Sequence, residues 1–154
     1  MTKLALGKKI PAFTVETTDG KLRSTDARGT KLVIYFYPRD NTPGCTREGE
    51  DFRDLHARFQ RAGVTVLGVS TDTLASHEKF RAKHGFPFHL AADTEHALAV
   101  KFDVWREKNM YGKKVMGIER STFLIDADGV LRAEWRKVKV DGHAAAVLEA
   151  AKAL

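Results

Sequence analysis

The sequence predicts an α/β domain with a central mixed β-sheet flanked by helices. Two observations indicate this fold class. Apolar runs of strand length alternate with helical patterns along the chain, and one strand–helix–strand segment has the order of a parallel βαβ unit. The 154 residues suit one domain, which we assign to 1–154, because no repeat, low-complexity tract or Pro/Gly/Ser-rich linker divides the sequence.

A small β-hairpin is expected near the N-terminus, ahead of the main sheet. Residues 13–15 and 21–23 flank a Thr-Asp-Gly turn at 18–20. The βαβ unit follows. Residues 32–37 form a continuous apolar and aromatic run, typical of a strand buried on both faces, and residues 64–69 form a second.

A helix is predicted between these two strands. It carries one apolar stripe at spacings of three and four residues, made by Phe52, Leu55, Phe59 and Ala62. Gly63 stands where that helix should end. The remaining expected elements are a helix at 74–84, a short strand at 88–92, a short helix at 96–102, a hairpin of strands at 121–126 and 130–138 with its turn at 126–129, and a C-terminal helix at 144–154.

The formal net charge is +6, which predicts a solvated basic surface. Nucleic-acid binding is the alternative. It has support only from a basic cluster formed by Lys108, Lys113, Lys114, Arg132, Arg136, Lys137 and Lys139. Because none of the common nucleic-acid motifs is present, we expect no nucleic-acid partner.

The chain has one cysteine, Cys45, so it cannot form an intramolecular disulfide and nothing indicates an oxidising compartment. The N-terminus lacks the pattern of a signal peptide, and no apolar run approaches the ~20 residues of a membrane span. We therefore expect a soluble cytoplasmic protein with no membrane partner, either a monomer or a weak dimer.

The most informative segment is 37–48, which follows the most apolar strand and opens the first long helix. Thr42 suits the N-cap and Pro43 the first helical position, so Gly44 and Cys45 should lie in the first turn. Free backbone N–H groups and the positive helix end favour an anion there, and therefore the nucleophilic thiolate of Cys45. Gly44 has no side chain, so a small oxidant could approach the sulfur closely. A lone cysteine is more often an inert core residue, but this position argues against that.

The segment resembles a known active site. Pro38-x-x-x-Thr42-x-x-Cys45 matches the signature of the peroxiredoxins, and the wider text around it looks like the bacterioferritin-comigratory, or peroxiredoxin Q, subfamily. Residues 7–13, 66–72 and 120–126 are also similar to that subfamily, in the same order along the chain. The resemblance implies a thioredoxin-like fold and a thiol-dependent peroxidase that reduces hydrogen peroxide and organic hydroperoxides in antioxidant defence.

The resemblance also assigns roles to single residues. Cys45 would be the peroxidatic cysteine, Thr42 would hold the peroxide, Arg120 would stabilise the thiolate and the leaving oxygen, Pro38 would shield the sulfur, and Glu48 would orient Arg120. Thr42, Gly44 and Arg120 would form the substrate site. These roles agree with the chemistry, because breaking an O–O bond moves negative charge to the departing oxygen, where fixed donors lower the barrier.

The chain departs from the subfamily in lacking a second cysteine. Many members carry a resolving cysteine either five residues after the first, where this chain has Glu50, or in the next helix, near 80–82, where it has none. Oxidised Cys45 should therefore be a sulfenic acid that an external thiol reduces: glutathione, a glutaredoxin, a thioredoxin or another thiol. A monothiol thiol–disulfide oxidoreductase and a holdase-type chaperone are the alternatives. A dithiol enzyme would need a cysteine at Glu48.

No metal site or cofactor is expected. His77 and His84 are seven residues apart on a predicted helix, whereas helical metal pairs usually lie three or four apart. The region of Trp105, Tyr111 and Met116 could be a lipid or partner surface, but we expect core packing and a loop over the active site.

Overall fold

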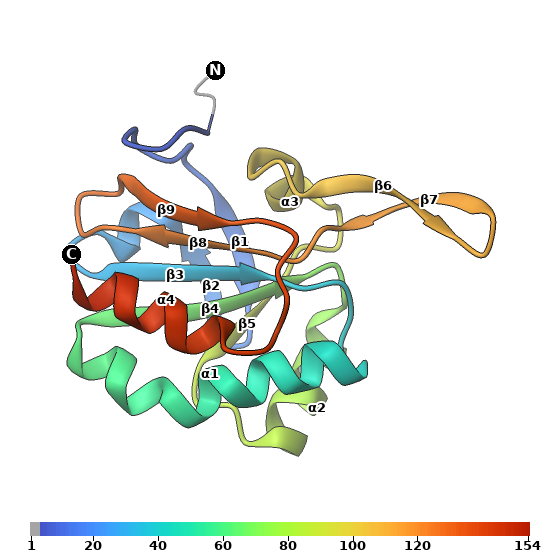
Figure 1. The fold of residues 1–154 in the computed structure, drawn as a ribbon, viewed down its shortest axis with the longest axis horizontal. Coiled ribbons are helices and arrows are strands. Elements are labelled where there is room, and N and C mark those ends of the chain that lie inside the picture. Colours follow the sequence, from blue (N-terminus) through green and yellow to red (C-terminus); the bar gives the residue numbers. More distant parts are fainter. Residues whose placement is uncertain (1–3) are drawn as a thin grey trace.

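The computed structural model describes residues 4–154 and contains one seven-stranded mixed sheet with a separate two-stranded arm (Figure 1). The strands are β1 Thr14–Thr17, β2 Gly20–Arg23, β3 Lys31–Phe36, β4 Val64–Ser70, β5 His89–Ala92, β6 Trp105–Met110, β7 Lys113–Ile118, β8 Ser121–Ile125 and β9 Leu131–Trp135. The helices are α1 Pro43–Arg61, α2 Leu74–His84, α3 Ala97–Lys101 and α4 His143–Lys152, with a 3₁₀ turn at Ser24–Ala27.

The order of strands in the large sheet is β2-β1-β5-β4-β3-β8-β9. The pairs β3–β4 and β4–β5 are parallel and the others antiparallel, so the predicted mixed α/β fold is confirmed. The N-terminal hairpin forms as expected, but β1 also pairs with β5 and so extends the main sheet.

Both faces of the sheet are covered, because the strands are apolar on both sides. Along β3, Val33 and Tyr35 pack against α1, α2 and α4, whereas Ile34 and Phe36 pack against α3 and the N-terminal segment. This alternation follows from the two-residue period of a strand. Among the described residues, no helix is both long and apolar enough to span a membrane.

Most predicted bounds agree with the structure, and α2 matches its prediction at both ends. The last strand is shorter than predicted: β9 ends at Trp135, and Lys137 has a positive φ of 51° that no strand accommodates. For the region of Trp105, Tyr111 and Met116, the expected core packing is confirmed for Trp105 alone, and the expected loop over the active site was wrong. Residues 105–118 form an antiparallel hairpin, β6–β7, that projects from the domain rather than closing over it (Figure 1).

Only the base of that hairpin packs on the core, through Trp105 and Ile118. Tyr111, at its turn, is fully exposed, and Met116 is half-exposed. Tyr111 and Gly112 both have positive φ values (54° and 79°), which is the backbone of a two-residue hairpin turn.

Candidate active site

Cys45 lies where the sequence placed it, in the first turn of α1. The buried strand β3 ends at Phe36, Thr42 occupies the N-cap, and Pro43 begins the helix. The Thr46 N–H donates to the Thr42 carbonyl at 2.9 Å, so the N–H groups of Gly44 and Cys45 precede the first intrahelical bond. These donors and the helix dipole create a positive potential at Cys45. The Cys45 side chain is only 1% exposed.

Arg120 reaches this turn from the other side. It lies between β7 and β8, and β8 runs antiparallel to β3 with Ser121 opposite Phe36, so the start of β8 meets the end of β3. Arg120 Nη2 donates to the Cys45 sulfur at 3.3 Å, and Nη1 donates to Glu48 Oε1 at 2.6 Å. One guanidinium therefore joins the sulfur to a carboxylate of the same helix.

Gly44 makes room for that guanidinium. A Cβ atom built on Gly44 would lie 3.2 Å from Arg120 Nη2, tighter than ordinary contact. The sequence suggested that Gly44 opens space for the oxidant. The structure shows that the same space admits Arg120.

Glu48 is almost completely buried, and its Oε2 is the one buried side-chain oxygen without a hydrogen-bond partner among residues 4–154. Burial raises the pKa of Glu48 from 4.5 to about 7, although Arg120 opposes this shift. Burial also disfavours the charge on Arg120, but Glu48 and Cys45 outweigh it, and the pKa of Arg120 is raised. Arg120 therefore stays cationic beside the sulfur, while Glu48 can change charge near neutral pH.

Thr42 and Pro38 lie in the loop before α1, and both are partly buried. The Thr42 hydroxyl donates to the Arg39 carbonyl at 2.9 Å instead of capping the helix. The structure thus brings Cys45, Glu48 and Arg120 into direct contact. In the described part of the chain it shows no hydrogen bond between the Thr42 hydroxyl and the sulfur.

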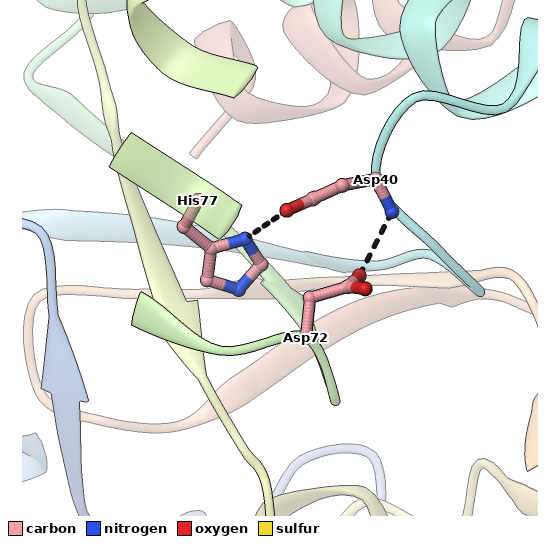
Figure 2. Close-up of side chains that lie close together, drawn as sticks. All are labelled: Asp40, Asp72 and His77. Atoms are coloured by element: carbon pink, nitrogen blue, oxygen red, sulfur yellow. Dashed lines mark hydrogen bonds and ion pairs between the residues drawn. The ribbon is translucent and has the colours of Figure 1, made fainter. Parts of the chain in front are cut away.

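A buried polar network, which the sequence did not reveal, holds the same loop. Figure 2 shows Asp40, Asp72 and His77 converging from the loop before α1, the segment between β4 and α2, and helix α2. Asp40 Oδ2 lies 2.8 Å from His77 Nδ1, and the Asp40 N–H donates to Asp72 Oδ2 at 2.8 Å. The Tyr37 hydroxyl donates to Asp40 Oδ1 at 2.7 Å.

His77 Nε2 lies 2.9 Å from the Ala91 carbonyl. A carbonyl can only accept, so Nε2 donates to Ala91, and Nδ1 faces the Asp40 carboxyl group. Asp40 and His77 are both buried, and their contacts tie the active-site loop to α2 and β5. One candidate ligand atom from each of Asp40, Asp72 and His77 lies within 4.8 Å of the others, as in a metal site. Hydrogen bonds already engage both ring nitrogens and both Asp40 oxygens, which indicates a structural network.

Two further residues contribute to the electrostatics of the site. Burial and the charge of Arg120 lower the pKa of Lys108, while Cys45 and Glu119 act in the opposite direction. Burial and Arg120 also lower the pKa of His143 to about 4, so that its ring is neutral at pH 7. The only sequence signal for Lys108 was its place in the basic cluster, and His143 had none.

Comparison with known proteins shows similarity over nearly the whole chain. Residues 6–134 match the model of the AhpC/TSA family. The chain is 48% identical to peroxiredoxin Bcp of Bacillus subtilis over 150 residues, covering 97% of this chain and 96% of the relative. It is 59% identical to peroxiredoxin Bcp of Xanthomonas campestris over 125 residues, which are 81% and 78% of the two chains.

Solved structures agree with this result. A peroxiredoxin Q structure from Xanthomonas campestris superposes with a TM-score of 0.88 at 53% identity, covering 92% of this chain and 90% of that one. A mutant PrxQ of Xylella fastidiosa superposes with a TM-score of 0.92 at 41% identity, covering 99% and 98%.

Proposed function

The chain belongs to the AhpC/TSA family, as a peroxiredoxin of the Bcp, or Q, type, and we propose that Cys45 is its peroxidatic cysteine. Its homologues establish it as a thiol-dependent peroxidase with a thioredoxin-like fold, and its single cysteine accords with a one-cysteine mechanism. One observation carries the assignment of the site: the Arg120 guanidinium donates to both the Cys45 sulfur and Glu48.

In the proposed reaction, the Cys45 thiolate attacks one peroxide oxygen. An S–O bond forms as the O–O bond breaks, and the leaving oxygen departs as hydroxide or alkoxide and takes a proton. Arg120 stabilises the thiolate and the charge on the leaving oxygen. Glu48 holds the guanidinium in position, Thr42 binds the peroxide through its hydroxyl, and Gly44 and Pro38 shape the space around the sulfur.

Cys45 is left as a sulfenic acid, which an external thiol must reduce because the chain has no other cysteine. Attack by that thiol forms a mixed disulfide and releases water. A second thiol then breaks the mixed disulfide and regenerates the Cys45 thiolate. A thioredoxin, a glutaredoxin or a glutathione-type thiol could fill this role chemically.

The cellular setting and the assembly complete the proposal. A lone thiol that must be reduced after each turnover suits the cytoplasm, where thiols are kept reduced. The chain is proposed to act as one domain over residues 1–154, and as a monomer or weak dimer. We propose no nucleic-acid partner.

Variants of the loop and of Arg120 test the assigned roles. Arg120→Ala should lower the second-order rate constant for hydrogen peroxide by about 100-fold or more, the usual effect of losing one transition-state donor. Thr42→Val should also lower it. Thr46→Val, one turn further along α1 with its N–H bond unchanged, is the matched control and should stay within about twofold. Stopped-flow fluorescence measures all three, and an unchanged rate in Arg120→Ala would contradict the role of that residue.

A further inference from the structure

The β6–β7 arm has two chemically different faces. Residues paired across an antiparallel ribbon point to the same side, and successive residues alternate between sides. The register therefore defines a neutral face, made by Trp105, Glu107, Asn109, Lys114, Met116 and Ile118. It also defines a basic face, made by Arg106, Lys108, Met110, Lys113, Val115 and Gly117.

Among the residues of the arm itself, an ion pair forms only on the neutral face. There, Lys114 Nζ lies 3.7 Å from Glu107 Oε1. The basic face contains no acidic residue. Arg106 is paired with Asp103 at the base of the arm (3.1 Å), which leaves Lys108 and Lys113 beside exposed Met110 and Val115. The basic face thus combines exposed apolar surface with positive charge that no residue of the arm pairs.

The basic face leads to the active site. Lys108 is close enough to Arg120 and Cys45 for both to affect its electrostatics, and Arg120 follows the end of β7 by two residues. Figure 1 shows the arm extending from the end of the sheet where β3 ends and α1 begins. Lys137 and Lys139 are exposed and extend the positive charge of the basic face. Val138, which lies between them, donates its N–H to the Arg120 carbonyl at 3.0 Å and so holds this segment beside Arg120.

The tip of the arm presents an aromatic side chain at a conformational cost. Tyr111 is fully exposed and has a φ of 54°, in the left-handed region that a bulky residue rarely adopts. Asn-Gly is the sequence that such a turn favours. An exposed aromatic ring at a strained position suggests a binding contact, since tyrosine is frequent at the energetic centres of interfaces.

We propose that the basic face of the arm, with Tyr111 at its tip, docks an acidic thiol protein that reduces oxidised Cys45. This inference rests on the proposed function, which requires an external thiol. The docked thiol would condense with the Cys45 sulfenic acid, forming an S–S bond and releasing water, and the partner's second thiol would then break that bond. The charge of the face selects an acidic partner. A second copy of this chain, with its own net charge of +6, would be repelled.

Two adjacent lysines provide a matched test. Lys113→Glu and Lys114→Glu change the net charge equally, but on opposite faces of the arm. The protein is first oxidised with one equivalent of hydrogen peroxide and then mixed with a thioredoxin of net negative charge or with neutral dithiothreitol. Lys113→Glu should lower the rate constant for the thioredoxin by about fivefold to tenfold, as expected for a charge at an interface. Lys114→Glu should stay within about twofold, and neither should affect dithiothreitol.

Tyr111→Asn gives a variant that keeps the turn, because Asn-Gly suits it. It should lower the thioredoxin rate about threefold with no loss of thermal stability. Equal losses in both lysine variants, no loss in either, or a parallel loss with dithiothreitol would overturn the docking proposal. The oxidation step separates the two hypotheses: if peroxide fails to oxidise Cys45 in the unmodified protein, the proposed function is refuted, and the docking proposal with it.

Discussion

Replacing Glu48 with glutamine should make the stability of the protein less dependent on pH. Glu48 is buried, it contacts Arg120 through one oxygen, and burial raises its pKa from 4.5 to about 7. At pH values between 4.5 and about 7, Glu48 binds a proton in the folded protein but releases it in the unfolded chain. The stability contributed by the protonated form is therefore complete below pH 4.5 and is lost as the pH rises through 7.

The size of the effect follows from the shift in pKa. Raising the pKa from 4.5 to about 7 corresponds to about 3 kcal/mol lost by pH 8, since each pH unit is worth about 1.4 kcal/mol. Glutamine can still accept a hydrogen bond from Arg120 through its carbonyl. Its amide N–H group would lie near the position of Oε2, where no partner is present, and this should lower the free energy of unfolding by about 1 kcal/mol at every pH. The free energy of unfolding of Glu48→Gln relative to wild type should therefore rise by about 3 kcal/mol between pH 5 and pH 8.

Urea unfolding at pH 5 and pH 8, at constant ionic strength, measures this difference. Glu50→Gln is the matched control, because it removes a charge from the same helix at a side chain that is 40% exposed and only loosely paired with Arg53. Its effect should stay within about 0.5 kcal/mol at both pH values. A Glu48→Gln difference that is equally small at both pH values would refute the argument, because it would show that Glu48 is ionised throughout.

Three other substitutions test separate parts of the structure. Arg120→Lys removes the planar fork that contacts both Cys45 and Glu48, so stopped-flow oxidation by hydrogen peroxide should slow by about 100-fold; a change below threefold would contradict this. Asp40→Asn breaks the buried pair with His77 and should cost about 3 kcal/mol in urea unfolding, whereas a loss under 1 kcal/mol would show that the pair is unimportant. Gly49→Ala places a Cβ atom against the Phe86 ring, closer than van der Waals contact allows, and should cost about 2 kcal/mol in urea unfolding; a loss under about 0.5 kcal/mol would contradict this.

Elements with local signals were predicted well from the sequence. Helix α2 has Thr73 at its N-cap, accepting from the Ser76 N–H, and Gly85 at its C-cap with a φ of 62°. Both residues signal helix ends in any sequence. The β6–β7 arm lacked such signals. Each of its faces mixes polar and apolar residues, so no alternation of apolar and polar residues identifies a strand, and its turn carries Tyr111 where asparagine or glycine would identify a hairpin.

The active site likewise contains contacts that follow from local sequence and contacts that do not. Cys45 and Glu48 lie on one helix, so their proximity follows from local structure, whereas the role of Arg120, 75 residues from Cys45, came only from the family resemblance. Asp40 and His77 are 37 residues apart and could not be paired from the sequence, because the contact depends on how α2 packs beside the loop. The sequence analysis set aside a metal pair of His77 and His84 because of their spacing, but it offered no partner for His77, which in the structure contacts the buried Asp40.

The central claim is that Cys45 is the peroxidatic cysteine and has no internal resolving partner. Reduced protein mixed with one equivalent of hydrogen peroxide in a stopped-flow instrument, followed by intact mass measurement, tests it most directly. We predict oxidation far faster than that of free cysteine thiolate, with a gain of one oxygen on Cys45, no disulfide within the chain, and no reaction in Cys45→Ser. A rate no greater than that of free cysteine, or an oxygen gained elsewhere than Cys45, would contradict the claim.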